Sequence, residues 1–109
     1  MRTLAAGIAL SLITSVLAAS PQVETAIKVF EAVGADANRL KTFCEMMQID
    51  EQMGEQDDPV LKAQIDKLLD QLGADFKAAW ETVEHIDEDS ADGKVLYAAL
   101  DELWDKCPD

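Results

Sequence analysis

Apolar residues recur three or four positions apart from about residue 21 onward, which is the spacing that places them on one face of an α-helix. No stretch of four or more residues alternates apolar and polar among β-branched side chains, so the sequence predicts no strand. Glycine, proline and capping residues divide the pattern into five helices. These run from about 21 to 33, from about 36 to 53, from 58 or 59 to 72, from 75 onward, and from 90 or 91 to near the last residue.

Polar residues mark the starts of these predicted helices. Asp58 is expected to cap the third helix and Asp75 the fourth, while Asp89 or Ser90 caps the fifth. The cleanest apolar stripe belongs to the third helix, which Gly73 ends. The stripes are, in chain order, Val23, Ala26, Ile27, Phe30 and Val33; Leu40, Phe43, Cys44 and Met47; Leu61, Ile65, Leu68, Leu69 and Leu72; Phe76, Ala79, Trp80 and Val83; and Leu96, Ala99, Leu100, Leu103 and Cys107.

Short links between successive helices place neighbours antiparallel. The sequence therefore predicts an all-α fold, a small antiparallel, up-and-down helical bundle of four main helices plus a shorter N-terminal one. Residues 19–109 are expected to form this single domain, because about 90 residues suffice for one hydrophobic core.

The first residues have a different character. Arg2 precedes an apolar run from Leu4 to Leu17, and the small residues Ala18 and Ala19 follow. This pattern predicts a secretory signal peptide over residues 1–18. The run is shorter than the roughly 20 apolar residues that a membrane span requires. We therefore expect export from the cytoplasm and no membrane association after signal cleavage; a retained N-terminal anchor is the alternative.

The two cysteines, Cys44 and Cys107, fall on the apolar stripes of the second and fifth predicted helices. Disulfides form in exported proteins, and two cysteines allow one intramolecular pairing. We therefore predict a Cys44–Cys107 disulfide in or beside the core. A redox or metal-binding pair is the alternative, although neither cysteine belongs to a C-x-x-C motif and two thiols do not make a structural zinc site.

The net charge of the chain limits the classes of partner that it is expected to bind. Without residues 1–18 the chain has 8 Lys and Arg against 22 Asp and Glu, a net charge of −14. Nucleic acid and anionic lipid are bound by neutralising phosphates with basic side chains, so neither is expected as a partner. The negative electric field around the chain instead favours cations and basic proteins as partners.

Catalysis is not expected. The chain has one histidine, His85, and no Gly-x-Ser-x-Gly, glycine-rich phosphate loop or His-Glu-x-x-His. A bundle of this size is also expected to leave little room for a concave substrate pocket. We predict no enzymatic activity and no organic cofactor.

Acidic residues gather in two segments that contain no Lys or Arg, one between Lys41 and Lys62 and one between Lys77 and Lys94. Exposed helix faces usually mix charge signs, because like pairs one turn apart destabilise a helix. On the predicted fourth helix, Glu81, Glu84 and Glu88 share the outward face. Glu84 and Glu88 also lie near the C-terminus of this helix, where the dipole disfavours negative charge. A bound cation would reverse these effects. The candidate ligands are Glu84, Asp87, Glu88, Asp89 and Asp92.

The segment 87–93 was compared with calcium-binding loops, since hard cations take several oxygen ligands from a glycine-containing turn. Counting from Asp87 puts the glycine one residue late and Ala98 at the position that requires glutamate. With Glu88 as the first loop residue, Gly93 falls at the correct position, but Ala99 falls at the position that requires glutamate. The segment is therefore not an EF-hand. Its alternative interpretation is a capping turn between two helices.

His85 is either a ligand, a pH-sensing group or simply an exposed polar residue. Met46, Met47 and Met53 carry soft thioethers that suit copper(I), but core packing explains them better, because the three do not share one helix face and Met47 lies on the apolar stripe.

Two stretches, 39–46 (RLKTFCEM) and 87–94 (DEDSADGK), together with the near-terminal Cys107, resemble small helical periplasmic proteins of alphaproteobacteria that include the LanD-type lanthanide-binding proteins. The resemblance covers most of the chain after residue 18, through short motifs. It implies a location in the bacterial periplasm. It also implies a carboxylate site for trivalent ions, in one subunit or shared between two subunits of a homodimer, without identifying the carboxylates. Lanthanides are hard cations, so the oxygen-ligand argument for calcium applies to them.

The sequence thus favours reversible, non-catalytic binding of a calcium or lanthanide(III) ion by surface carboxylates. The alternative is an acidic helical domain that binds a basic protein or acts like a stress chaperone.

Overall fold

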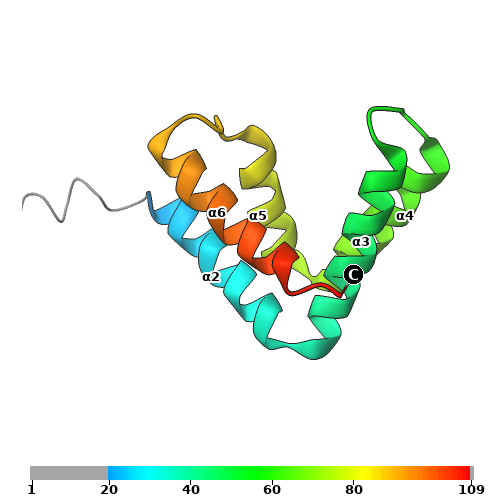
Figure 1. Ribbon diagram of the computed structural model, residues 1–109, viewed down its shortest axis with the longest axis horizontal. Coiled ribbons are helices and arrows are strands. Elements are labelled where there is room, and N and C mark those ends of the chain that lie inside the picture. The colour runs from blue at the N-terminus through cyan, green and yellow to red at the C-terminus, as the bar shows by residue number, and fades with distance from the viewer. Residues whose placement is uncertain (1–19, 109) are drawn as a thin grey trace, which may run out of the picture.

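The computed structural model describes residues 20–108, so the predicted signal peptide lies outside the described range (Figure 1). The predicted all-α fold is confirmed, with helices and no strand in these residues. The helices are α2 (Pro21–Ala35), α3 (Ala37–Met53), α4 (Pro59–Leu72), α5 (Ala74–His85) and α6 (Ala91–Asp105). The N-terminal helix, expected to be shorter, has 15 residues, as α6 has.

Side-chain caps explain where most helices begin. The Asp58 carboxylate accepts hydrogen bonds from the backbone N–H groups of Val60 and Leu61, as predicted for α4. The prediction that Asp75 caps α5 is wrong. Gly73 alone links α4 to α5 and is the capping residue of both helices, with a φ of 109° that suits glycine. A one-residue link leaves no separate position for a polar cap.

The helices form two arms that diverge in a V (Figure 1). One arm is the antiparallel α3–α4 hairpin, and the other packs α2 against α5 and α6. The arms meet at the lower end of the V, where α2 contacts α3 and α4 contacts α5. The helices are therefore antiparallel neighbours, but the hairpin points away from the rest instead of lying along it.

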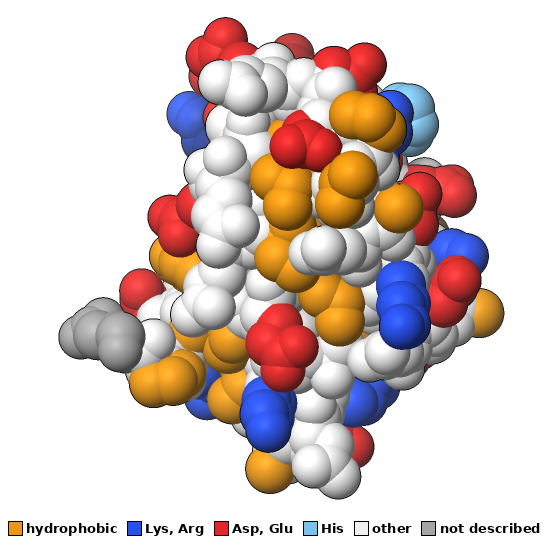
Figure 2. Space-filling view, turned by 90° about the vertical axis from the view of Figure 1, so that its right-hand side faces the viewer, with side chains coloured by type: hydrophobic (Ala, Val, Ile, Leu, Met, Phe, Trp, Pro, Cys, Tyr) orange, Lys and Arg blue, Asp and Glu red, His pale blue; other side chains and the backbone are white. Residues whose placement is uncertain are grey.

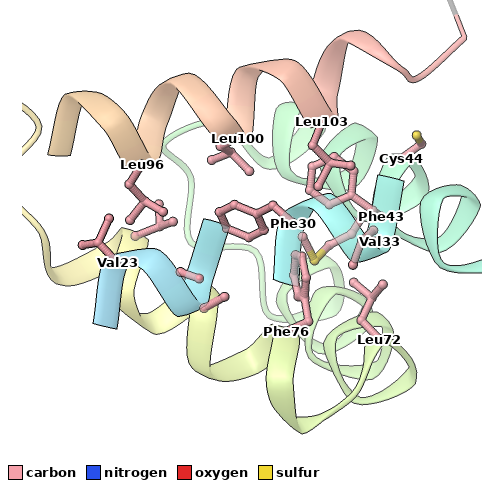
Figure 3. Packing of buried hydrophobic residues seen from close by; sticks show 14 residues of the cluster. Val23, Phe30, Val33, Phe43, Cys44, Leu72, Phe76, Leu96, Leu100 and Leu103 are labelled. Carbon is pink, nitrogen blue, oxygen red and sulfur yellow. The ribbon is translucent and has the colours of Figure 1, made fainter. Parts of the chain in front are cut away.

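The core is aromatic where the arms meet. The ring of Phe76 lies 5.7 Å from that of Phe30 and 5.9 Å from that of Phe43, centroid to centroid, and all three side chains are fully buried (Figure 3). Among the described residues, every buried residue is either hydrophobic or glycine. On α3, Met46 is fully buried and Met47 half-buried, the reverse of the expected order.

The outer part of the α3–α4 arm has little core. Leu72 is the one buried residue of α4, and the rest of its apolar stripe is half-buried. Figure 2 looks onto the outer side of this arm, where hydrophobic side chains form a strip between acidic and basic ones. Val60, near the tip, is 64% exposed. An arm of two helices can bury one face of each helix against the other, so apolar surface remains open on both sides.

The predicted disulfide is confirmed. Cys44 and Cys107 are bonded, with their Cα atoms 5.7 Å apart, and the bridge ties the base of α3 to the segment that follows α6. Cys44 is buried and Cys107 half-buried, so the bridge lies at the edge of the core. Among the described residues, no helix is both long and apolar enough to cross a membrane.

Candidate functional site

The turn between α5 and α6 is a capping structure. The Asp87 carboxylate accepts a hydrogen bond from the backbone N–H of Asp89 at 2.9 Å, and the Ser90 hydroxyl donates to the backbone carbonyl of Asp87 at 2.7 Å. The same hydroxyl accepts from the N–H of Gly93 at 2.9 Å and so caps α6. The structure therefore contains the capping turn that was the alternative interpretation of this acidic segment.

Gly93 is required by a close approach of two backbone segments. It is buried in the first turn of α6, and a Cβ atom at this position would collide with the backbone carbonyl of Asp87. The glycine of the supposed cation loop thus has a packing role. It lets the turn fold against α6 closely enough for the Ser90 cap to form.

The five candidate ligands do not converge. Glu84 lies in the last turn of α5, whereas Glu88 lies beyond it in the turn, because α5 ends at His85 and Ile86 is extended. The predicted shared helix face for these two acids is therefore wrong. Glu84, Asp87, Glu88 and Asp89 are exposed and Asp92 is half-buried. Among residues 20–108, no group of three or more His, Cys, Asp or Glu side chains is arranged to hold a metal ion.

Charge at this end is not balanced by bases. The ion pairs of the described residues join Arg39 to Asp75, Lys62 to Asp57 and Lys77 to Asp70, and none includes a candidate ligand. The pKa of Lys77 is raised, first by its 2.8 Å hydrogen bond to the Asp70 carboxylate. Glu84, Asp87, Glu88, Asp89 and Asp92 therefore have no ion-pair partner among the described residues.

A depression of 760 Å³ lies beside the turn, between the start of α2, the end of α5 and the start of α6. Its polar lining includes Glu81 and His85 of α5, Asp92 of α6 and the hydroxyl of Ser90. Of the predicted ligands Asp92 alone lines it, and Glu81 was not among the predicted ligands. The four-residue spacing of Glu81 and His85 is the sequence signal that places both on one side of α5. The sequence did not predict this open depression.

A second concave surface lies between the arms, and we call it the inter-arm groove. It has a volume of 330 Å³ and is lined by residues of α3, α4 and α5. Its apolar residues are Met46, Met53, Ile65, Leu69 and Trp80, and its acidic residues are Asp50, Asp66, Glu81 and Glu84. The sequence did not predict it, since it depends on the angle between the two arms.

Tyr97 reports on the same end of the molecule. Its hydroxyl donates to the backbone carbonyl of Val83 at 3.4 Å, and the side chain is half-buried. Burial raises the pKa of this phenol, and the negative charge of Glu88 raises it further. The negative charge of Glu88, in the turn, therefore shifts the pKa of the neighbouring Tyr97.

Comparison with protein-family models, with curated proteins and with solved structures gives no match.

Proposed function

We propose that this protein binds a hard multivalent cation, calcium or a lanthanide(III) ion, reversibly and without catalysis. The ligands are drawn from Glu84, Asp87, Glu88, Asp89 and Asp92, at the α5–α6 end. The observation that carries the proposal is uncompensated charge, because none of these carboxylates has a basic partner in the described residues. Glu84 adds negative charge to the last turn of α5, where the helix dipole disfavours it. A bound cation makes this arrangement favourable.

The coordination sphere extends beyond one chain's carboxylates in this proposal. Calcium takes six to eight oxygen ligands, some of which are commonly water. Because the chain does not group three acids at one point, the remaining ligands are water molecules or carboxylates of a second copy. The resemblance of the sequence to LanD-type proteins supports the second source, a cation shared between two subunits of a homodimer.

We also propose that the protein acts in the bacterial periplasm. The composition of residues 1–18 supports export. The Cys44–Cys107 disulfide is compatible with an oxidising compartment.

Terbium titration of the chain lacking residues 1–18 tests the proposal, with excitation of tryptophan and detection of terbium emission. Trp80 lies one helical turn before Glu84, whereas Trp104 lies at the far end of α6. We expect saturable emission at micromolar ion that survives about 0.1 M salt. Trp80→Phe should remove most of the emission, and Trp104→Phe should leave most of it.

The matched variants separate a site from a general negative field. Combined substitution of Asp87, Asp89 and Asp92 by Asn should abolish binding. The control replaces three exposed acids elsewhere, Glu45→Gln, Glu51→Gln and Asp101→Asn, and changes the net charge equally. Equal loss in both variants, or emission that salt removes, would overturn the proposal. Analytical ultracentrifugation with lanthanum then distinguishes a monomer from a cation-bridged dimer.

A second candidate function, binding of a basic protein partner, is favoured by one observation, the apolar floor and acidic rim of the inter-arm groove.

A further inference from the structure

The inter-arm groove has the surface chemistry of a docking site. Its floor contains the half-buried side chains of Ile65, Leu69 and Trp80, together with Met53 near the tip of the α3–α4 arm. Ile65, Leu69 and Trp80 pack against the core from one side, and all four residues face the open groove. Apolar surface of this kind gains free energy when a partner removes it from water.

The rim of the groove is acidic. The carboxylates of Asp50, Asp66, Glu81 and Glu84 line it, and all four side chains are exposed and unpaired in the described residues. Two lysines line it as well, but each forms an ion pair with an acid outside the groove lining. Lys62 pairs with Asp57 at 3.9 Å, and Lys77 with Asp70 at 2.8 Å. The groove therefore presents net negative charge around an apolar centre.

We propose that the inter-arm groove binds a basic amphipathic helix of another protein. Apolar side chains of that helix would contact the groove floor, and its Lys or Arg side chains would meet the acidic rim. A second copy of this chain does not fit, because each copy carries a net charge of −14 without residues 1–18 and its acids would face the same acidic rim. The proposal is independent of the cation site, apart from Glu84, which belongs to both.

The length of the groove sets the size of the contact. Along α4 it runs from Lys62 to Leu69, which is about 10 Å at 1.5 Å per residue. About two turns of a partner helix fit this length. The binding determinant is therefore two or three apolar side chains at i, i+3 or i+4 spacing, flanked by basic residues.

Fluorescence anisotropy with a defined peptide tests the proposal. The probe is a fluorescein-labelled peptide of roughly 14 residues made of Leu and Lys, with the leucines on one helical face. The reference is a peptide of the same composition whose leucines are spread around the helix. At about 0.15 M salt, where exposed charges are screened, the probe should bind and the reference should bind at least about tenfold more weakly. Equal binding of both peptides would show charge attraction alone and overturn the proposal.

Two matched variants locate the contact. Asp50→Asn with Asp66→Asn removes rim charge without touching the proposed cation ligands, and should weaken probe binding by about tenfold. Glu45→Gln with Asp101→Asn removes the same charge from surfaces that line neither concavity and should weaken it by less than about threefold. Both pairs consist of exposed residues, so both variants are expected to fold. Equal weakening by the two pairs would overturn the assignment to the groove.

Trp80 gives a second, local measurement. In the Trp104→Phe variant it is the one remaining tryptophan, and burial of its half-exposed ring by the peptide should shift its emission to shorter wavelength as binding saturates. Anisotropy that saturates without any change in Trp80 emission would place the peptide elsewhere and overturn the proposal. Because this experiment contains no metal ion, its result is separate from that of the terbium titration.

Discussion

Arg39 and Asp75 join the two arms of the molecule through an ion pair in which the guanidinium and the carboxylate are 2.9 Å apart. The same Arg39 nitrogen donates to the backbone carbonyl of Leu72, also at 2.9 Å. The start of α3 is thereby tied to the corner at which α4 ends and α5 begins. Asp75, expected from the sequence to cap a helix, instead contributes to a tertiary contact.

Removing each partner should have unequal effects. Arg39→Ala should lower the free energy of unfolding by about 1–2 kcal/mol, because it takes away the donor to the Leu72 carbonyl as well as the ion pair. Asp75→Asn should cost less than about 1 kcal/mol, since the pair is partly exposed and solvent screens it. Urea unfolding of the two single variants and the double variant measures the coupling. A loss with Asp75→Asn as large as that with Arg39→Ala would contradict this account.

Breaking the disulfide should cost much more. The bond between Cys44 and Cys107 closes a loop with a sequence separation of 63, and the loop-entropy model gives roughly 4 kcal/mol for a loop of this length. We expect the Cys44→Ala and Cys107→Ala double variant to lose about this much stability in urea unfolding. Unfolding of the unmodified chain with and without reductant is the parallel measurement. A difference below about 1 kcal/mol would contradict the prediction.

Gly93→Ala should destabilise the α5–α6 end, because the new methyl group would collide with the Asp87 carbonyl. We expect a loss of about 1–3 kcal/mol, typical of overpacking. Gly34→Ala is the control. A Cβ there would approach the side chains of Lys106 and Leu103 at 3.2–3.3 Å, and the long lysine side chain can move aside. The control should be neutral or gain up to about 1 kcal/mol from helix propensity. Equal losses in thermal unfolding would contradict the packing role of Gly93.

Tyr97 is the one tyrosine of the chain, so an ultraviolet pH titration reports it alone. Its pKa is raised above the usual 10.0, first by burial and then by Glu88. Because the folded state favours the protonated phenol, this contribution to stability is fully present below pH 10.0 and is lost as pH rises through the folded-state pKa. Glu88→Gln should lower the measured pKa. An unchanged pKa in that variant would contradict the proximity of the two groups.

The helices were predictable because each has a clear apolar stripe and most have a clear stop, as Gly73 shows at the end of α4. The end of α5 at His85 has no such signal and was not predicted. The disulfide followed from the positions of Cys44 and Cys107 on two such stripes. The arrangement of the arms was not predictable, because helix periodicity fixes which residues face a neighbour but not the angle at which two helix pairs meet. For the same reason the apolar pattern predicted Met47 as a core residue, whereas Met46 is the fully buried one.

The candidate site was predicted less well than the fold. The acid-rich segment 87–93 suggested a ligand loop, yet the structure uses Asp87 and Ser90 for capping and Gly93 for close packing. Local sequence could not distinguish these uses, because caps and hard-cation ligands draw on the same oxygen-bearing residues. The inter-arm groove was not predicted from the sequence, because Trp80 and Ile65 come together only through tertiary structure.

The aromatic contact between Phe43 and Phe76 has a mechanical consequence. The α3–α4 arm meets the other three helices at one end, and α3 extends ten residues beyond Phe43, about 15 Å, to Met53. The arm therefore projects from a base that this pair of rings holds together with the Cys44–Cys107 disulfide and the Arg39–Asp75 ion pair. A small change in side-chain volume at position 76 becomes a larger displacement at the tip, so the width of the groove can be tuned by a residue that never touches its occupant.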